Sequence, residues 1–515
     1  MGSSKSKKTA FIMIVNVAST IIASLCSLIV TSKILLHLGS DYNGVNSTAT
    51  QIVTILGLIE GGFTLASQVA LYSPVADGDI KRINAISSYT SRKMMTYGIY
   101  TFLAGIAVSA VYACFIKSEL DYVTILAVMV LSVATTAFNL GIVCKYRLIF
   151  QVTQTEYKYG VVNIGINILQ YVTVFIALDF TDNIILVRFI YFTAEVLKGL
   201  AVIIMARKEF RYLDFHQNCS DVKIKGTKDV FVAKITALFY NSAPVLFIST
   251  FIGTSATSVY AVYLSITNII LTVLSMVVNA PTHGIGQLIV ESEESGDKTR
   301  LTSVFKELEV ATTFLSCLLC SVTFVILVPF ISLYTAKVSD ISYVDNFYAI
   351  VMVLITLFQI MHIPSGICMN VSGSFKAIKI TQIIATVVLI ISMGLGVWLW
   401  GLKGLLLGKL LTSITLCALE IGYAYKHIIK IDFMAFVRVV VPNYIVTISL
   451  STAEYYLISH FLSITSWIIW IAVAVVVTLI NLGVLIVSNL ITNRISLKNL
   501  MTRVYRMVSK NTQNA

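Results

Sequence analysis

Long apolar stretches separated by short polar breaks run along most of the chain. A helix that crosses a bilayer needs about 20 mainly apolar residues, and fourteen stretches meet that length. They lie at residues 11–36, 46–72, 94–116, 122–144, 159–178, 183–205, 230–252, 257–288, 307–333, 346–370, 379–400, 402–424, 439–461 and 465–489. The pattern predicts an all-α polytopic membrane protein with about fourteen transmembrane helices and short loops.

The positions of lysine and arginine orient these helices. Cytoplasmic loops of membrane proteins carry an excess of both residues. With a cytoplasmic N-terminus, most of the 37 Lys and Arg residues fall on the cytoplasmic side, and the outer loops hold Lys117, Lys337 and Lys403. Both termini are therefore predicted to be cytoplasmic. The formal net charge of +12 follows from this topology, and we expect no nucleic-acid partner.

Composition limits the classes of function. Hydrophobic residues make up 57% of the chain and charged residues 12%, so the spans leave no room for a sizeable soluble catalytic domain. The six histidines show no metal-ligand spacing, and Cys317 and Cys320 lie in an apolar run with no second Cys or His pair. We expect a protein that is not an enzyme, with no metal and no cofactor.

An internal repeat divides the predicted helices. Gly39 follows the first helix and Gly253 the seventh, while Gly78-Asp79 follows the second and Gly296-Asp297 the eighth. Six helices per repeat is an even number, so the two lobes share one orientation and are related by a pseudo-twofold axis along the membrane normal. The predicted domains are a first lobe, a cytoplasmic linker, a second lobe, an appended helix pair and a basic cytoplasmic tail, at residues 1–205, 206–229, 230–424, 425–489 and 490–515.

Several motifs resemble a known family. The stretch Lys33-Ile34-Leu35-Leu36-His37-Leu38-Gly39, then Tyr42-Asn43-Gly44, Ile59-Glu60-Gly61-Gly62-Phe63 and Gly78-Asp79 are similar to the start of Wzx-type oligosaccharide flippases. These flippases are polysaccharide transporters of the multidrug/oligosaccharidyl-lipid/polysaccharide exporter superfamily. Tyr260 and Asn279-Ala280-Pro281 resemble the corresponding span of the second half, and the similarity covers most of the first twelve spans.

The resemblance implies a function and its partners. It implies two six-helix lobes that move an undecaprenyl-pyrophosphate-linked oligosaccharide from the inner to the outer leaflet of the bacterial inner membrane, for O-antigen-like surface polysaccharide assembly. Other polysaccharide-assembly proteins of the membrane, and a coupling proton or sodium ion, are the further partners it suggests. The extra helix pair resembles the fourteen-span lipid II flippases. A cation-coupled drug antiporter of the same superfamily is the other alternative, but residues 11–36 lack the carboxylate that related drug exporters carry there.

The pyrophosphate of such a substrate calls for cations inside the membrane. Bringing that anion into hydrocarbon without partners costs many kcal/mol. The basic residues within predicted spans are Lys33, Arg188, Lys198, Lys234 and Lys409. Each either reaches a cavity or extends to the membrane surface. Lys234 lies about one helical turn inside the seventh span, ahead of Asn241. It is the leading candidate for substrate binding, with Asn241 as a further candidate.

Two acidic residues are candidates for ion coupling. Glu60 lies in the second span beside several glycines, with no cation within a helical turn, and a buried carboxylate of this kind can bind and release a proton. Its alternative role is a hydrogen bond that fixes helix packing. Glu195 shares a helical face with Arg188 and Lys198 and can pair with Lys198 at i+3. We expect that face to point away from lipid, as a neutral structural pair or as part of a ligand site.

Overall fold

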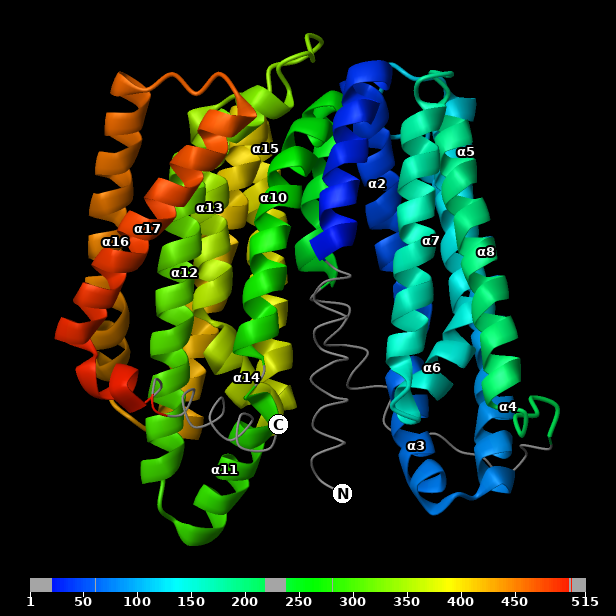
Figure 1. The fold of residues 1–515 in the computed structure, drawn as a ribbon, viewed down its shortest axis with the longest axis horizontal. Helices are drawn as coiled ribbons and strands as arrows, with labels where there is room; N and C mark the ends of the chain where they lie inside the picture. Colours follow the sequence, from blue (N-terminus) through cyan, green and yellow to red (C-terminus); the bar gives the residue numbers. More distant parts are fainter. Residues whose placement is uncertain (1–20, 61, 218–237, 280, 500–501, 503–515) are drawn as a thin grey trace. The chain divides into compact units, whose positions relative to one another are not determined.

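The computed structural model describes residues 21–60, 62–217, 238–279, 281–499 and 502. Within these ranges all regular secondary structure is helical, as predicted. Eleven helices are long and apolar enough to cross a membrane, or twelve if the bent pair Ser40–Glu60 and Phe63–Asp77 is counted as one span. The chain divides into two compact units, residues 1–261 and 262–515 (Figure 1).

Unit 1 is a helical bundle whose buried apolar residues form separate clusters. Its first described helix is Ile21–Leu38. It then holds α2 (Ser40–Leu56), η1 (Gly57–Glu60), α3 (Phe63–Asp77), α4 (Ile80–Tyr112), α5 (Tyr122–Phe138), η2 (Asn139–Val143), α6 (Cys144–Val152), α7 (Glu156–Ala177), α8 (Ile184–Glu209), the helix Leu238–Ile252 with its end η3 (Ile248–Ile252), and the start of α10 (Thr254–Val278). α5 packs between α4 and α8, and α7 packs on α8. One of these clusters includes Val45, Val128 and Val187, which are fully buried.

Unit 2 is built around α12. It holds the rest of α10, then α11 (Thr282–Ser295), α12 (Thr299–Tyr334), α13 (Asn346–Met361), α14 (Ile363–Val371), α15 (Phe375–Tyr423), η4 (Ala424–Ile429), α16 (Met434–Phe461) and α17 (Trp467–Thr492). α12 contacts α13, α16 and α17. The appended pair α16 and α17 is joined by amides, because Asn489 Nδ2 donates to Asn443 Oδ1 at 2.8 Å and Asn481 Nδ2 donates to Glu454 at 2.7 Å. Such polar contacts between apolar helices fix their register.

α15 explains part of the difference between the helices observed and the spans predicted. Its residues Trp400 and Gly401 leave the helical conformation, with Gly401 at φ 58° and ψ −132°. The halves on either side fold back on each other, since Ser392 Oγ donates to the Gly408 carbonyl at 3.0 Å and a Cβ on Gly396 would lie 2.2 Å from the Gly404 carbonyl. Glycines allow this close approach. The single segment Phe375–Ile429 therefore contains the two spans predicted at 379–400 and 402–424.

The predicted seventh span, 230–252, lies partly outside the described residues. Only its apolar part Leu238–Ile252 is described, as a helix shorter than a full span. The count of fourteen therefore stays a prediction, as does the cytoplasmic placement of both termini. Several helices also extend past the predicted spans. For example, α4 begins at Ile80 and α8 ends at Glu209.

The glycines of the sequence repeat share local conformations. Gly39 and Gly253 have φ of 87° and 148°, and each separates two consecutive helices. Gly78 and Gly296 have φ of 69° and 74° and cap α3 and α11 in the left-handed conformation. Glycine is favoured at helix ends of this kind because it has no Cβ. The glycines that mark the repeat therefore have positive φ at corresponding helix ends, and the relation between two six-helix lobes stays a prediction.

The fourteen-span topology predicts which loops face outward. Single cysteines at Lys117 and Lys337, in a chain without its native cysteines, are expected to react with an impermeant thiol reagent added outside intact cells. Cysteines at Lys225 and Lys298 are expected to react only after the membrane is permeabilised. The measurement is labelling of each variant before and after permeabilisation, and reversed labelling at any of the four positions contradicts the topology.

Candidate functional site

Arg188 is a buried cation within a spanning helix. It lies on α8 with 9% of its surface exposed, and its Nη2 donates to the Asn46 carbonyl of α2 at 2.7 Å. The same nitrogen lies 3.5 Å from the Thr50 hydroxyl, and the guanidinium is 5.8 Å from the centroid of the Tyr191 ring. Among the described residues no carboxylate forms an ion pair with Arg188, and its Nε has no acceptor. An intramembrane cation of this kind marks a functional site by default.

Glu195 and Lys198 form an ion pair on the same helix. Lys198 Nζ lies 2.5 Å from Glu195 Oε2, which confirms the pairing predicted at i+3. Asn139 Nδ2 donates to the other oxygen of Glu195 at 2.5 Å. Asn139 begins the π-helical segment η2, a type of segment that is frequent at functional sites. Arg188 and Lys198 are each 9% exposed, so this face of α8 points inward as expected. On this face of α8, Arg188 is the residue whose charge no acid among the described residues balances.

Lys33 has an acidic partner at the end of α7. Its Nζ lies 2.7 Å from Asp179 Oδ2, donates to the Phe175 carbonyl at 2.6 Å and sits 3.7 Å from the centroid of the Phe175 ring. The ammonium therefore neutralises Asp179 and satisfies a carbonyl at a helix end. These contacts give Lys33 a role in closing that end of the bundle.

Glu60 lies where the second predicted span breaks. The short helix η1 ends at Glu60, and α3 begins at Phe63 after Gly62, whose φ is 77°. The two helical stretches meet at 46°. The Thr64 hydroxyl donates to Glu60 Oε2 and also lies 3.8 Å from Cys144 Sγ of α6. The carboxylate is thus held at a helix break and not inside a straight span.

The other predicted binding residues are spread over the chain. Asn241 is exposed on the helix Leu238–Ile252 of unit 1. Lys409 is 2% exposed in the second half of α15, in unit 2. Lys234 lies outside the described residues, so its role as the leading phosphate ligand stays a prediction.

A polar cluster that sequence reasoning missed surrounds Asp41 at the start of α2. Asp41 Oδ2 accepts hydrogen bonds from the Ser118 hydroxyl at 2.5 Å and the Glu119 backbone at 2.9 Å. Its Oδ1 accepts hydrogen bonds from two hydroxyls at the start of α10. They belong to Thr254 and, at 3.2 Å, to Ser255. These five residues, named here the Asp41 cluster, join the start of α2, the loop after α4 and the start of α10.

Two close contacts extend the Asp41 cluster along α2. Asn43 Nδ2 donates to the Ser258 hydroxyl at 2.7 Å. A Cβ on Gly44 would lie 1.8 Å from the Thr254 carbonyl oxygen, so only glycine fits between the two helices. The cluster lies at the end of unit 1 that is predicted to face outward. Its signal in the sequence was the Tyr42-Asn43-Gly44 motif, to which Asp41 is adjacent.

Unit 2 contains buried carboxylates that are not among the acidic candidates named from the sequence. Glu420 on α15 is 5% exposed, and its Oε2 lies 2.8 Å from His362 Nδ1 at the junction of α13 and α14. Gln382 Nε2 donates to the other oxygen at 3.3 Å. Glu309 on α12, which is 4% exposed, accepts the Tyr425 hydroxyl at 2.6 Å. Buried acids held in this way are candidates for ion coupling.

Comparison of the fold with solved structures gives clear relatives. Lipid II flippase MurJ in an inward closed conformation superimposes with a TM-score of 0.67 at 12% identity, over 91% of this chain and 97% of that one. An inward-facing multidrug resistance MATE family transporter of the MOP superfamily gives a TM-score of 0.64 at 11% identity, over 81% of this chain and 98% of that one. The chain shares the overall fold of these structures. A MATE in a bent conformation gives 0.54 at 12% identity.

The sequence itself matches no family model and no curated protein. At 11–12% identity the likeness to the solved structures shows the MOP fold alone, and function has to be argued from the residues of this chain. The fold is that of a multi-span membrane protein.

Proposed function

We propose that the chain is a flippase that moves an undecaprenyl-pyrophosphate-linked oligosaccharide from the inner to the outer leaflet of the bacterial inner membrane. The observation that carries this proposal is Arg188, a cation buried between α8 and α2 with no carboxylate partner among the described residues. A cation without a counter-charge attracts a phosphate and repels a cationic drug. The expected cargo is an O-antigen-like glycan for surface polysaccharide assembly, delivered to other polysaccharide-assembly proteins of the membrane.

The two kinds of solved structure cover different shares of this chain. The MATE transporter is matched over 98% of its own length but over 81% of this chain, whereas MurJ is matched over 91% of this chain. More of this chain therefore has a counterpart in the lipid flippase than in the drug transporter. This observation also favours a second candidate, a lipid II-type flippase, which would use the same cations for the same pyrophosphate.

The contacts of α2 suggest how substrate binding is linked to opening. α2 carries Asn46 and Thr50, which contact Arg188, and also Asn43 and Gly44, which meet α10. Release of cargo to the outer leaflet requires the Asp41 cluster to separate. A phosphate that draws Arg188 away from α2 removes a contact on one side of this helix, and so favours its movement from α10 on the other.

Ion coupling through Glu60 gives a test in transport. Glu60→Gln keeps the hydrogen bond to Thr64 available but removes the titratable group. We expect normal membrane insertion, transport reduced several-fold, and a flatter pH profile of transport than that of wild type in proteoliposomes. Glu195→Gln is the comparison, because Glu195 is paired with Lys198 and its loss should lower protein abundance instead. A pH profile unchanged in Glu60→Gln assigns Glu60 to helix packing.

The function itself is tested by deletion of the gene in its native host. We expect an undecaprenyl-linked oligosaccharide to accumulate on the cytoplasmic side, measured by mass spectrometry of lipid extracts and by protection of the glycan from added glycosidase. Accumulation of lipid II in its place assigns the second candidate. Normal glycan export together with increased sensitivity to cationic drugs contradicts both and supports a drug antiporter.

A further inference from the structure

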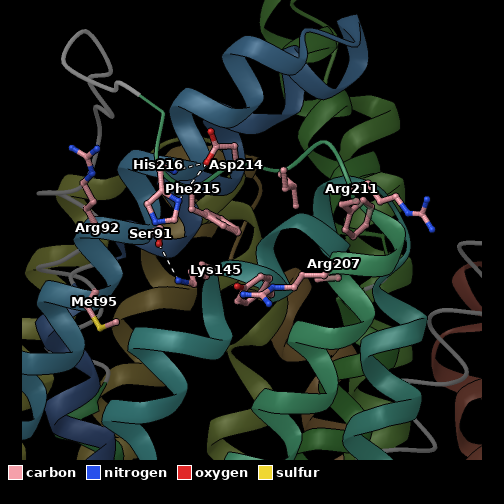
Figure 2. Close-up of a pocket in the computed structure, with 13 residues that line it drawn as sticks. Ser91, Arg92, Met95, Lys145, Arg207, Arg211, Asp214, Phe215 and His216 are labelled. Atoms are coloured by element: carbon pink, nitrogen blue, oxygen red, sulfur yellow. Dashed lines mark hydrogen bonds and ion pairs between the residues drawn. The ribbon is translucent and has the colours of Figure 1, made fainter.

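Unit 1 contains a cavity that the proposed transport path does not use. It has a volume of about 710 Å³ and lies between the first half of α4, the start of α6 and the end of α8, beneath the chain that follows α8 (Figure 2). Ser91 and Arg92 of α4, Lys145 of α6 and Arg207 of α8 line it. Its volume is in the range of small-molecule sites, about 300–1,000 Å³. All of its lining residues belong to unit 1 and none is among the predicted substrate ligands.

The outer wall of the cavity is held in place by the chain that follows α8. Residues 210–217 turn back onto α4, where Asn84 Nδ2 donates to the Tyr212 carbonyl at 2.8 Å and the Ser88 hydroxyl donates to the Asp214 carbonyl at 3.0 Å. The Asp214 backbone donates in return to Asn84 at 3.2 Å. Phe215 packs edge-on against Tyr146 of α6, with ring centroids 5.3 Å apart. These contacts give a formed cavity with a fixed wall.

The cavity carries a surplus of positive charge. Arg92, Lys145, Arg207 and Arg211 line it, and the acid among its lining residues is Asp214. Asp214 is engaged with His216, whose Nδ1 lies 3.5 Å from its carboxylate. No carboxylate in the described ranges forms an ion pair with any of the four cations, although Arg147 and Lys158 nearby are both paired with glutamates. The charges of this cavity are therefore left for a ligand to balance.

Lys145 lies at the centre of this arrangement. Its Nζ donates to the Ser91 hydroxyl at 3.0 Å and lies 5.1 and 5.4 Å from the ring centroids of Phe215 and Tyr146. Figure 2 shows the Arg207 side chain extending toward Lys145, whereas Arg211 extends away from it. An ammonium, a guanidinium and a hydroxyl that converge on one space offer several donors to a tetrahedral oxyanion.

From this geometry we infer that the cavity binds a phosphate group through Lys145, Arg207 and Ser91. The phosphate belongs either to the headgroup of an anionic lipid or to a phosphate ion in solution. The predicted topology puts these helix ends at the cytoplasmic face, where anionic headgroups attract basic residues. A headgroup phosphodiester has two non-bridging oxygens and one negative charge, and a free phosphate has more of both, which matches the donors and the surplus positive charge. The inference does not depend on the proposed function, because the site lies apart from Arg188 and the Asp41 cluster.

The test uses the full chain in detergent and two probes. Native mass spectrometry measures adducts of phosphatidylglycerol, whose headgroup is anionic, and of phosphatidylcholine with the same acyl chains, whose headgroup has no net charge. Titration with inorganic phosphate measures the soluble ligand. The double variant Lys145→Gln/Arg207→Gln is expected to bind the preferred probe about 10- to 100-fold more weakly, because two charge-assisted contacts are lost. The control is Lys93→Gln, which removes an exposed cation of α4 outside the cavity and should bind as the wild type does.

The two probes distinguish the sources of the phosphate. Tight phosphatidylglycerol adducts that the double variant loses and Lys93→Gln keeps assign a lipid headgroup. Binding of inorganic phosphate that is lost in the same variant, with equal adducts of both lipids, assigns a phosphate ion. The single variant Lys145→Arg should still bind the preferred probe, since it keeps the charge that the double variant lacks. If the double variant unfolds, Arg207→Gln alone is used, because Arg207 is exposed. Equal binding of both probes by wild type and variant overturns the inference.

Discussion

Replacing Gly44 by alanine is expected to reduce glycan transport by tenfold or more, while leaving the protein in the membrane. The added Cβ would lie 1.8 Å from the Thr254 carbonyl oxygen, which is backbone and cannot turn aside. α2 and α10 must therefore separate, and the hydrogen bonds of Asp41 to Thr254 and of Asn43 to Ser258 lengthen with them. Overpacking of this kind costs about 1–3 kcal/mol. That is enough to shift a balanced closed–open equilibrium by about tenfold or more.

The accompanying measurement is exposure of Ser258. In a chain whose native cysteines are replaced, Ser258→Cys should react slowly with an impermeant thiol reagent, and about tenfold faster when Gly44→Ala is added. Gly57→Ala is the matched control, since it adds the same Cβ on the same span where nothing lies within 4 Å. If Ser258→Cys reacts equally fast in combination with Gly44→Ala and with Gly57→Ala, the α2–α10 contact is not part of an opening movement.

The positions of the helices could be predicted from the sequence because the bilayer imposes them. A spanning helix has to be about 20 residues long and apolar. The apolar pattern therefore predicted two spans within α15, and their predicted boundary coincides with the fold-back at Gly401. The repeat could be read for a similar reason. Its glycines occupy conformations with positive φ that other residues rarely adopt, so they stand out at equivalent helix ends.

The partners of the charged residues could not be predicted, because they come from distant parts of the chain. Arg188 meets Asn46, and Lys33 meets Asp179, without any periodic relation between them. Only the pair Glu195–Lys198 was found beforehand, since helical geometry alone brings residues at i and i+3 together. The same limit hid the Asp41 cluster, where three separate segments converge on one carboxylate.

The basic cavity shows how tertiary structure gives a linker a role. Residues 206–229 were predicted as a connection between lobes, on the grounds of their polarity. The structure extends α8 into this region and fastens the following residues to α4 through Asn84 and Ser88. Arg207 thereby comes close to Lys145, a juxtaposition that depends on the path of the chain and not on local sequence.

Removing the charge of Arg188 is expected to lower transport by about 10- to 100-fold with little loss of folded protein. Arg188→Gln takes away one charge-assisted contact to the substrate phosphate, worth about 1.5–3 kcal/mol. The fold loses less, because the Thr50 hydroxyl also donates to the Asn46 carbonyl, at 2.9 Å, and no described carboxylate is left without its partner. Arg188→Lys keeps the charge but not the planar guanidinium, so it should transport at an intermediate rate.

Lys198→Gln is the matched control for this prediction, since it removes a cation that is equally buried on the same helix. It leaves the Glu195 carboxylate with Asn139 and no cation. Breaking such a buried pair costs about 3–5 kcal/mol, so the amount of folded protein should fall while transport per folded molecule stays near that of wild type. Both quantities are measured together, as glycan translocated per molecule of protein that elutes as a single species and unfolds cooperatively on heating. Arg188 is a structural residue instead if Arg188→Gln behaves as Lys198→Gln does, with abundance lost and transport per folded molecule retained.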